Sequence, residues 1–224
     1  MNTISFLAAR LVLTVLLICP TLASAQSAGR LTAELKPIQL LKPQTDSGRP
    51  LMQVLKDRQS SRQFSTKKLP LQVLSNMLWA AFGINRPDDG KRTAPSSSNV
   101  QDIDIYVATA KGCYLYDAKA HTLVPVVSDD IRALTGTQDY VGGAPVNLVY
   151  VSDFSKLGDR PDEWKYRTAR LDTGFISQNV YLFCASEGLA TVVRGLIDTE
   201  TLSKAMKLRN DQRITLAQSV GYPR

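Results

Sequence analysis

The chain has 224 residues, of which 44% are hydrophobic and 21% are charged, as in an ordinary globular protein. This composition excludes a disordered or collagen-like chain, and the length suffices for one or two domains with a core that needs no staples. The formal net charge is +7, but no run of five basic residues occurs. Dispersed charge argues against nucleic-acid binding and favours a basic site for a phosphorylated small molecule.

The first 25 residues are typical of a secretory signal peptide. Arg10 is their only charged residue, an apolar run at 11–18 follows, Pro20 ends the run, and Ala-Ser-Ala at 23–25 matches the small residues before a cleavage site. The uncharged stretch is shorter than the ~20 residues that a membrane span needs. We therefore expect cleavage after Ala25, no stable membrane span, and an exported protein, periplasmic or extracellular.

After the signal, residues 26–50 are predicted to form an extended N-terminal arm, and residues 51–224 a single domain. Apolar spacings of three and four predict helices, and alternating or β-branched runs predict strands. The predicted elements are a helix at 51–56, a helix opened by Leu69-Pro70 and stopped at Gly83, a polar loop at 85–99, strands at 103–107, 113–116 and 123–127, a short helix at 129–134, a strand at 144–152, a connection at 153–166, a helix at 167–187 capped by Gly188, a strand at 189–194, a short helix at 199–206 and a strand at 214–220. Without repeats or an interior linker, the pattern predicts one α+β domain.

Two cysteines remain after removal of the signal, Cys113 and Cys184, and one histidine, His121. Two cysteines are too sparse for a disulfide framework, so we expect both in the core. A single histidine leaves no Cys-His metal cluster, and His121 is predicted to be a turn residue. A Cys-His nucleophile pair has no supporting motif.

The first motif with chemical potential is Arg58-Gln-Ser-Ser-Arg62, which lies between the first two predicted helices. Two guanidinium groups with hydroxyl groups between them can make charge-assisted hydrogen bonds to a phosphate or to an electron-rich ring edge. The alternative is a solvated basic turn.

The second motif is Arg92-Thr-Ala-Pro-Ser-Ser-Ser-Asn99, a loop of small residues before a strand. Small side chains let backbone N–H groups approach a flat ligand, and an asparagine can both donate and accept at a heterocycle edge. The alternative is a flexible Ser-rich linker.

The third motif, at 186–195, runs from a helix through Gly188 to a strand that ends in Arg194-Gly195. A helix-to-strand turn explains Gly188, whereas Gly195 could expose its N–H to a cofactor.

Together these stretches resemble the nitroreductase family of flavin enzymes, particularly the group related to SagB-type dehydrogenases. The matching stretches occur in the family's order and cover about 51–223. They are Arg58-x-Ser-x-Arg62-x-Phe64, Leu74-x-x-Met-Leu-Trp-Ala-Ala-x-Gly83, Arg92-Thr-Ala-Pro-Ser-Ser97, Gly112-x-Tyr-x-Tyr-Asp117, Ala144-Pro-Val146, Gly174-x-x-x-Gln-Asn-x-Tyr-Leu182, Gly188-Leu-Ala-Thr191 and Gly221-Tyr-Pro223.

The resemblance implies a three-layer α+β fold, with a mainly antiparallel sheet flanked by helices, and an intertwined homodimer with FMN at the subunit interface. By position, Arg58, Ser60 and Arg62 would grip the FMN phosphate and the pyrimidine edge of the ring. Pro95, Ser96, Ser97 and Asn99 would line the isoalloxazine, partly that of the partner subunit. Gly195, after Arg194, would place an N–H near flavin N5.

Two departures from the family pattern bear on the cofactor. Relatives complete the phosphate site with a basic pair beyond Gly-Tyr-Pro, whereas this chain has only Arg224 there, so we expect fewer charges on the phosphate. Arg194 stands where others often have an acidic or apolar residue. If its side chain faces the ring, it would stabilise anionic reduced flavin and raise the flavin potential.

The function implied is an FMN-dependent oxidoreductase that moves hydride or electrons from a donor through flavin N5 to a small organic acceptor, such as a nitroaromatic or a quinone, in alternating half-reactions. No G-x-G-x-x-G follows a strand, so the donor is NAD(P)H lying transiently over the flavin or another reductant. The loop at 84–90 and the connection at 153–166 are expected to select the substrate. There Trp164 and Tyr166 either stack on it or cap the core. The alternative function is an exported flavin-binding carrier of the same fold without turnover.

Overall fold

A computed structural model of the chain describes residues 34–224. The predicted signal peptide and the first part of the predicted arm, up to residue 33, lie outside the described residues. No helix within 34–224 is long and apolar enough to cross a membrane.

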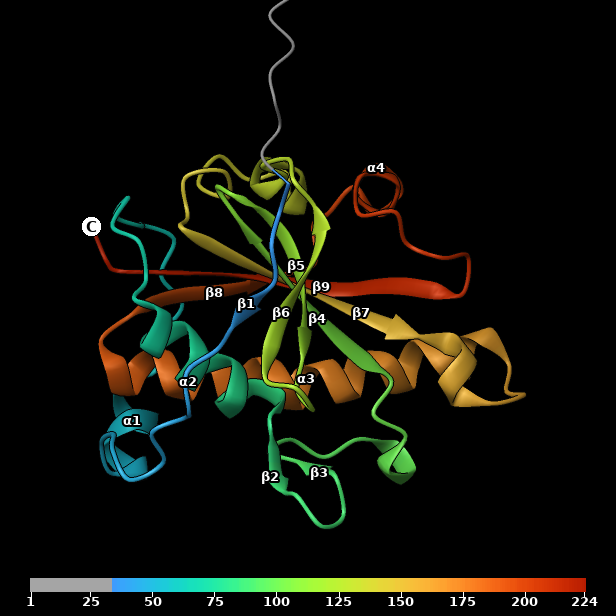
Figure 1. Cartoon of the computed structure of the whole chain (residues 1–224), viewed down its shortest axis with the longest axis horizontal. Coiled ribbons are helices and arrows are strands. Elements are labelled where there is room, and N and C mark those ends of the chain that lie inside the picture. Colours follow the sequence, from blue (N-terminus) through green and yellow to red (C-terminus); the bar gives the residue numbers. More distant parts are fainter. Residues whose placement is uncertain (1–33) are drawn as a thin grey trace, which may run out of the picture. The chain divides into compact units, whose positions relative to one another are not determined.

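Seven strands form one sheet in the order β1-β6-β5-β4-β7-β9-β8, and every neighbouring pair is antiparallel (Figure 1). The strands are β1 (Ile38–Gln39), β4 (Ile103–Thr109), β5 (Gly112–Asp117), β6 (Thr122–Val127), β7 (Val146–Asp153), β8 (Ala190–Arg194) and β9 (Gln212–Gly221). Every residue of β7 is buried, as expected for a central strand that is covered on both faces.

Helices cover both faces of the sheet, which makes three layers. The helices α2 (Leu71–Phe82) and α3 (Asp162–Glu187) pack together on one face, and α1 (Leu51–Asp57) contacts α3. The short helix α4 (Thr199–Ala205) and the 3-10 helix Arg132–Thr135 lie on the other face (Figure 1). The predicted three-layer α+β fold is confirmed.

The side chains of strand β4 point alternately to the two faces of the sheet and so contribute to two separate hydrophobic clusters. Ile105 and Val107 contribute to the hydrophobic cluster under α2 and α3, while Tyr106 and Ala108 contribute to the cluster under α4. Successive residues of this strand therefore enter the two cores on opposite faces of the sheet.

Helix α3 begins five residues earlier than predicted. Pro161 precedes its first turn, and Asp162 and Glu163 carry negative charge at the positive end of the helix dipole. The helix ends at Gly188 in the left-handed conformation, with φ of 68°, which confirms the predicted cap. The predicted connection at 153–166 is thus shorter, and its last residues belong to α3.

Two small sheet elements were not predicted. The arm supplies β1, which pairs with β6 at the sheet edge, and the predicted polar loop contains the hairpin β2 (Ile84–Arg86) and β3 (Lys91–Arg92). Strands of two or three residues are too short to show alternation. A bond of 2.7 Å from Arg86 Nη2 to the carbonyl of Arg92 helps to close the hairpin.

Candidate functional site

The first predicted motif runs beside the outer edge of β8. Arg58 caps α1, and its guanidinium carbon lies 5.4 Å from the centroid of the Tyr181 ring. The N–H of Ser61 donates to the carbonyl of Thr191 at 2.9 Å, which fixes the segment to the strand. The motif is therefore held against the sheet, in contrast to the alternative of a free basic turn.

Tyr181 of α3 joins this motif to the end of β8. Its hydroxyl accepts a hydrogen bond of 2.9 Å from the N–H of Val193 and lies 2.9 Å from Ser60 Oγ. Ser60 is thereby tied to the end of β8, next to Arg194 and Gly195. Tyr181 was not assigned a role from the sequence, where it reads as one more apolar residue of a helix.

Arg62 and Arg224 lie at the same end of the sheet. The N–H of Ser65 donates to the carbonyl of Tyr222 at 2.9 Å, and Phe64 pairs with Pro223, so the residues after Arg62 run beside the chain terminus. Within residues 34–224, neither of these arginines nor Arg58 is joined to a carboxylate. The three arginines that the resemblance assigns to the FMN phosphate are therefore not neutralised by an ion pair within this part of the chain.

Arg194 is buried, with 6% of its surface exposed, and its side chain lies on the α4 side of the sheet, as does its pairing partner Ala217. Its guanidinium donates to Ser219 Oγ at 2.7 Å, Thr135 Oγ1 at 2.7 Å and Asn147 Oδ1 at 3.1 Å. Burial lowers the pKa of Arg194 to about 10, so the group stays positive at neutral pH. The charge is fixed beneath the end of β8.

The segment with Gly136 and Gln138, to which the sequence assigns no role, contacts the side chain of Arg194. Arg194 Nε and Gln138 Oε1 are both buried and have no hydrogen-bond partner among residues 34–224. A Cβ at Gly136 would come within 2.5 Å of the first atom and 2.7 Å of the second. Only glycine fits at 136, and an unsatisfied donor and acceptor converge beside it. Nothing in the sequence signals this, because Gly136 and Gln138 lie in an aperiodic stretch.

Gly195 is exposed directly after Arg194, and a Cβ there would make only an ordinary contact of 3.5 Å with Leu216. The structure therefore leaves space above the backbone at the predicted N5 position. Ser60, Gly195 and the Gly136-Gln138 pair all surround the end of β8.

The loop with Pro95, Ser96, Ser97 and Asn99 lies elsewhere on the chain. Its 3-10 turn, Ser97–Asn99, is bound to α3 through the N–H of Ser97, which donates to the carboxyl oxygens of Asp172 at 3.0 and 3.2 Å. Asp172 is nine residues from Tyr181, about 13 Å along the helix axis. One chain therefore does not bring this loop together with Arg58, Ser60 and Arg62.

Trp164 and Tyr166, the predicted stacking residues, both belong to the first turns of α3. Trp164 is partly buried against the main core, which favours the capping role. Tyr166 is exposed, packs edge-to-face on Phe154 at 5.0 Å and accepts a hydrogen bond of 3.1 Å from Arg213 Nε. Of the two, only Tyr166 reaches a surface depression.

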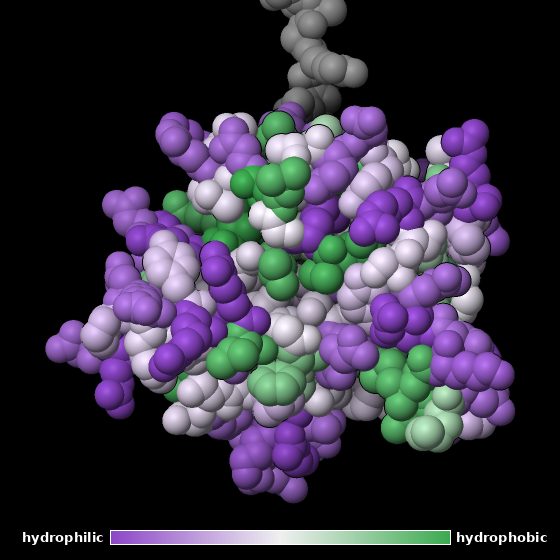
Figure 2. Space-filling model, turned by 180° about the vertical axis from the view of Figure 1, so that it is seen from behind, coloured by the Kyte–Doolittle hydropathy of each residue, from purple (hydrophilic) through white to green (hydrophobic). Residues whose placement is uncertain are grey.

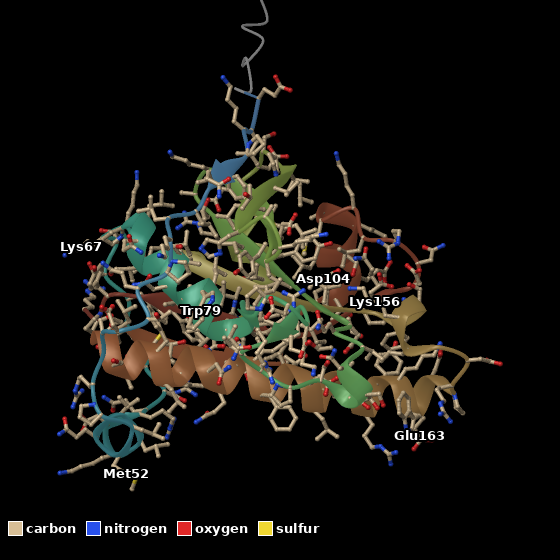
Figure 3. The ribbon with its side chains drawn as sticks, turned by 60° about the horizontal axis from the view of Figure 1, so that its bottom comes forward. Met52, Lys67, Trp79, Asp104, Lys156 and Glu163 are labelled. Atoms are coloured by element: carbon tan, nitrogen blue, oxygen red, sulfur yellow. The ribbon has the colours of Figure 1, made fainter. Side chains whose placement is uncertain are left out.

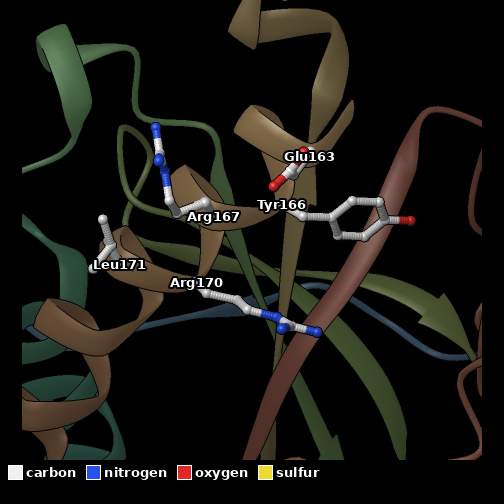
Figure 4. Close-up of a pocket in the computed structure, with 5 residues that line it drawn as sticks. All are labelled: Glu163, Tyr166, Arg167, Arg170 and Leu171. Atoms are coloured by element: carbon white, nitrogen blue, oxygen red, sulfur yellow. The ribbon is translucent and has the colours of Figure 1, made fainter. Parts of the chain in front are cut away.

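That depression, of about 610 Å³, lies on the outer side of α3 and is lined by Glu163, Tyr166, Arg167, Arg170 and Leu171. In Figure 4 the side chains of Tyr166 and Arg170 extend in the same direction from the helix. A separate cavity of about 490 Å³ lies at the start of α2, with apolar walls and Lys68 and Lys111 among its lining residues. None of the sequence-predicted site residues lines that cavity.

Cys113 and Cys184 are buried and free, which confirms the predicted core packing. Burial raises the pKa of Cys113 to about 12 and raises that of Cys184 further, so neither thiol ionises at neutral pH. His121 occupies the turn between β5 and β6 with φ of 50°, as the turn prediction requires.

The sequence profile of the nitroreductase family matches residues 55–222. A Methanocaldococcus jannaschii protein named as a nitroreductase is 27% identical over 169 residues, which cover 71% of this chain and 85% of that one. A crystal structure from Ralstonia eutropha JMP134, also named as a nitroreductase, is 40% identical with a TM-score of 0.81, covering 84% of this chain and 90% of that one. A chain of the Escherichia coli microcin synthetase McbBCD complex shares the fold, with 22% identity, a TM-score of 0.65 and coverage of 92% and 85%.

Proposed function

Because this chain belongs to the nitroreductase family, we propose that it is an FMN-dependent oxidoreductase that passes hydride or electrons from a donor to a small organic acceptor such as a nitroaromatic or a quinone. The observation that carries the proposal is the end of β8. There, two buried polar atoms that are unsatisfied within the described residues lie beside Gly136, the exposed Gly195 follows the strand, and Tyr181 joins Ser60 of the arginine motif to Val193.

The residues present fit FMN. The dianionic phosphate matches Arg58, Arg62 and Arg224, and the Ser60 hydroxyl adds a hydrogen-bond donor. The pyrimidine ring of a flavin carries an N–H group and carbonyl oxygens. These groups match the unpartnered Gln138 Oε1, which can only accept there, and Arg194 Nε, which can only donate.

FMN, when bound, supplies the hydride chemistry, and the protein supplies position and electric field. The fixed positive charge of Arg194 favours a negatively charged ring near Gly195, in line with the expectation of a raised flavin potential. The N–H of Gly195 is proposed to orient the ring at its N5 edge.

We propose that the working form is a homodimer, because one chain separates the two halves of the site along α3. The outer side of α3 exposes Leu171 (61%) and Phe175 (50%), and α1 exposes Met52 (77%). Figure 3 shows Met52 extending away from the body of the protein, and Figure 2 shows hydrophobic residues between hydrophilic ones on the reverse face. A second copy that covers these side chains would bring its own Pro95, Ser96, Ser97 and Asn99 toward the flavin of the first.

The remaining features stay proposals drawn from the sequence. The predicted cleavage after Ala25 places the protein in the periplasm or outside the cell. In that location NAD(P)H is a less accessible donor than a membrane redox carrier. The SagB-type subgroup also stays a prediction. Tyr166 beside the depression on α3 is the residue proposed to contact the substrate.

The colour of the purified protein tests the proposal. It should be yellow, should bleach with dithionite and should recover its colour with a quinone or a nitroaromatic. Arg58→Ala should weaken FMN binding on the order of tenfold, because a charge-assisted hydrogen bond contributes about 1.5 to 3 kcal/mol.

Lys56→Ala is the matched control, because Lys56 lies two residues earlier on α1 and is not part of the motif. Bound flavin that never turns over would support the carrier alternative. A colourless protein that refuses added FMN would contradict both functions.

A further inference from the structure

The cavity at the start of α2 lies apart from the residues assigned to FMN. Its volume of about 490 Å³ is in the usual range of small-molecule sites. Its wall is mainly aliphatic and combines segments that are distant in the sequence: the arm, α2 and the residues before it, β6 and β7. The side chains that form this wall are Ile38, Leu69, Leu74, Leu123 and Val146.

A buried tyrosine with a free hydroxyl group also lines the cavity. Tyr114 of β5 is only 2% exposed, and burial raises its pKa, so the hydroxyl stays protonated at neutral pH. Within residues 34–224 the hydroxyl makes no hydrogen bond, and unlike Gln138 Oε1 it is not sealed from solvent. By contrast, Tyr116 on the same strand is hydrogen-bonded to His121 Nδ1 at 3.1 Å. The cavity therefore offers a ligand one unused hydrogen-bond donor.

Two lysines bring positive charge to the same cavity. Lys68 precedes α2, Lys111 lies between β4 and β5, and both side chains are exposed at its open side. Neither forms an ion pair with another residue of 34–224. The third cation there, Arg132, is paired with Asp130 at 2.7 Å and donates to the carbonyl of Ala144 at 3.0 Å, so it holds the wall in place. Two free ammonium groups and a free hydroxyl donor fit an anionic ligand.

We propose that this cavity binds the anion of a fatty acid. The acyl chain lies against the aliphatic wall, and the carboxylate accepts hydrogen bonds from the Tyr114 hydroxyl and from the ammonium groups of Lys68 and Lys111. A carboxylate has about four lone-pair positions, so it can accept from three donors. An aliphatic chain fits better than a flat ring, because Tyr114 is the only aromatic side chain among the described residues that line the cavity.

The length of the acyl chain tests the aliphatic wall. Calorimetric titration of the purified protein, saturated with FMN, should show that decanoate binds more tightly than octanoate. Two more buried methylene groups should strengthen binding about fifteenfold, equivalent to about 1.6 kcal/mol. Equal affinities for the two acids would show that the chain stays in water and would overturn the proposal.

Tyr114→Phe tests the hydroxyl donor, because it keeps the buried ring. Decanoate affinity should fall on the order of tenfold, as expected for the loss of a hydrogen bond to a charged group. Tyr116→Phe is the matched control, since it removes a hydroxyl from the same strand that does not line the cavity. This control should bind decanoate as the wild type does.

Lys68→Ala and Lys111→Ala test the charges. Each should weaken decanoate binding about two- to fivefold, the usual size of an exposed ion pair, and leave the affinity for uncharged octanol unchanged. Lys67→Ala is the matched control. Lys67 lies beside the start of α2 (Figure 3), and its Nζ is 4.2 Å from the centroid of the Tyr222 ring, outside the cavity lining.

Wild-type affinity for decanoate in Tyr114→Phe and in the two lysine variants would place the ligand elsewhere and overturn the proposal. Displacement of decanoate by FMN would also overturn it, because the acid would then occupy the flavin site. A change from dimer to monomer on adding decanoate, seen by sedimentation, would assign the cavity to an interface between two copies instead. A protein that never binds FMN would contradict the proposed function and leave the decanoate titrations as decisive as before.

Discussion

At the scale of single residues, Tyr181 connects the arginine motif to the sheet. Tyr181→Phe should lower the free energy of unfolding by about 1 to 2 kcal/mol, because the N–H of Val193 loses its acceptor. The same change should weaken FMN binding, because Ser60 loses its fixed partner. Urea unfolding and flavin titration measure the two effects.

Ser60→Ala is the control for this residue. This change removes only the hydrogen bond between Ser60 and Tyr181, and the N–H of Val193 keeps its acceptor. The free energy of unfolding should therefore fall by less than about 0.5 kcal/mol. Equal unfolding midpoints for Tyr181→Phe and the wild type would show that the hydroxyl does not hold this corner of the fold.

At the scale of elements, His121 fastens the N-terminal arm to the domain. The carbonyl of Leu41 can only accept, so His121 Nε2, 3.0 Å away, carries the proton, and Nδ1 accepts from the Tyr116 hydroxyl at 3.1 Å. Nε2 also lies 2.7 Å from Ser75 Oγ of α2. The neutral ring thus joins the arm, α2 and β5.

Burial lowers the pKa of His121 below its ordinary value of 6.5. Its contribution to stability is therefore fully present above pH 6.5 and is lost as the pH falls through the lower pKa of the folded protein. The difference in unfolding free energy between the wild type and His121→Asn should shrink from pH 7 to pH 5. Asparagine tolerates the left-handed backbone at this position.

Denaturant unfolding at several pH values measures this difference, and comparing the two proteins cancels the opposite titration of Asp172. The carboxyl of Asp172 has a raised pKa in the folded state, so it favours folding at low pH in both proteins. A difference that is the same at pH 5 and pH 7 would contradict the role of His121 as a fastener.

Helices and strands that are long enough to show a repeating apolar pattern could be predicted from the sequence, whereas elements of two or three residues could not. The helix ending at Gly83 and the strand at 144–152 follow from apolar spacing. The first turn of α3 was missed because it is charged, and β1 because two residues show no period. In the site, residue types identified the arginine motif. The hydrogen bond from Ser97 to Asp172 joins positions 75 residues apart, which only the fold reveals.

At the scale of the whole molecule, the exposed apolar residues of α3 predict self-association. Phe175→Glu would place a charge in the proposed interface, so sedimentation should show a monomer and a dimer weakened at least ~100-fold, about 2.7 kcal/mol. FMN affinity should fall with it, because the partner's loop is lost from the site.

Val124→Glu is the control for this interface, since Val124 is also an exposed apolar residue but lies on β6, near the opposite edge of the sheet. It should leave both the sedimentation profile and flavin affinity unchanged. A Phe175→Glu protein that sediments as the wild type and binds FMN equally well would remove α3 from the interface.

The pairing of β1 with β6 affects the order in which the chain can fold. The ribosome makes Gln39 first, yet its partner Thr122 follows 83 positions later. Until β1 docks, β6 presents unpaired backbone groups, and such open edges recruit strands from other chains. Newly synthesised chains are therefore most prone to aggregate before β1 pairs with β6. Shortening the N-terminal arm should lengthen this period.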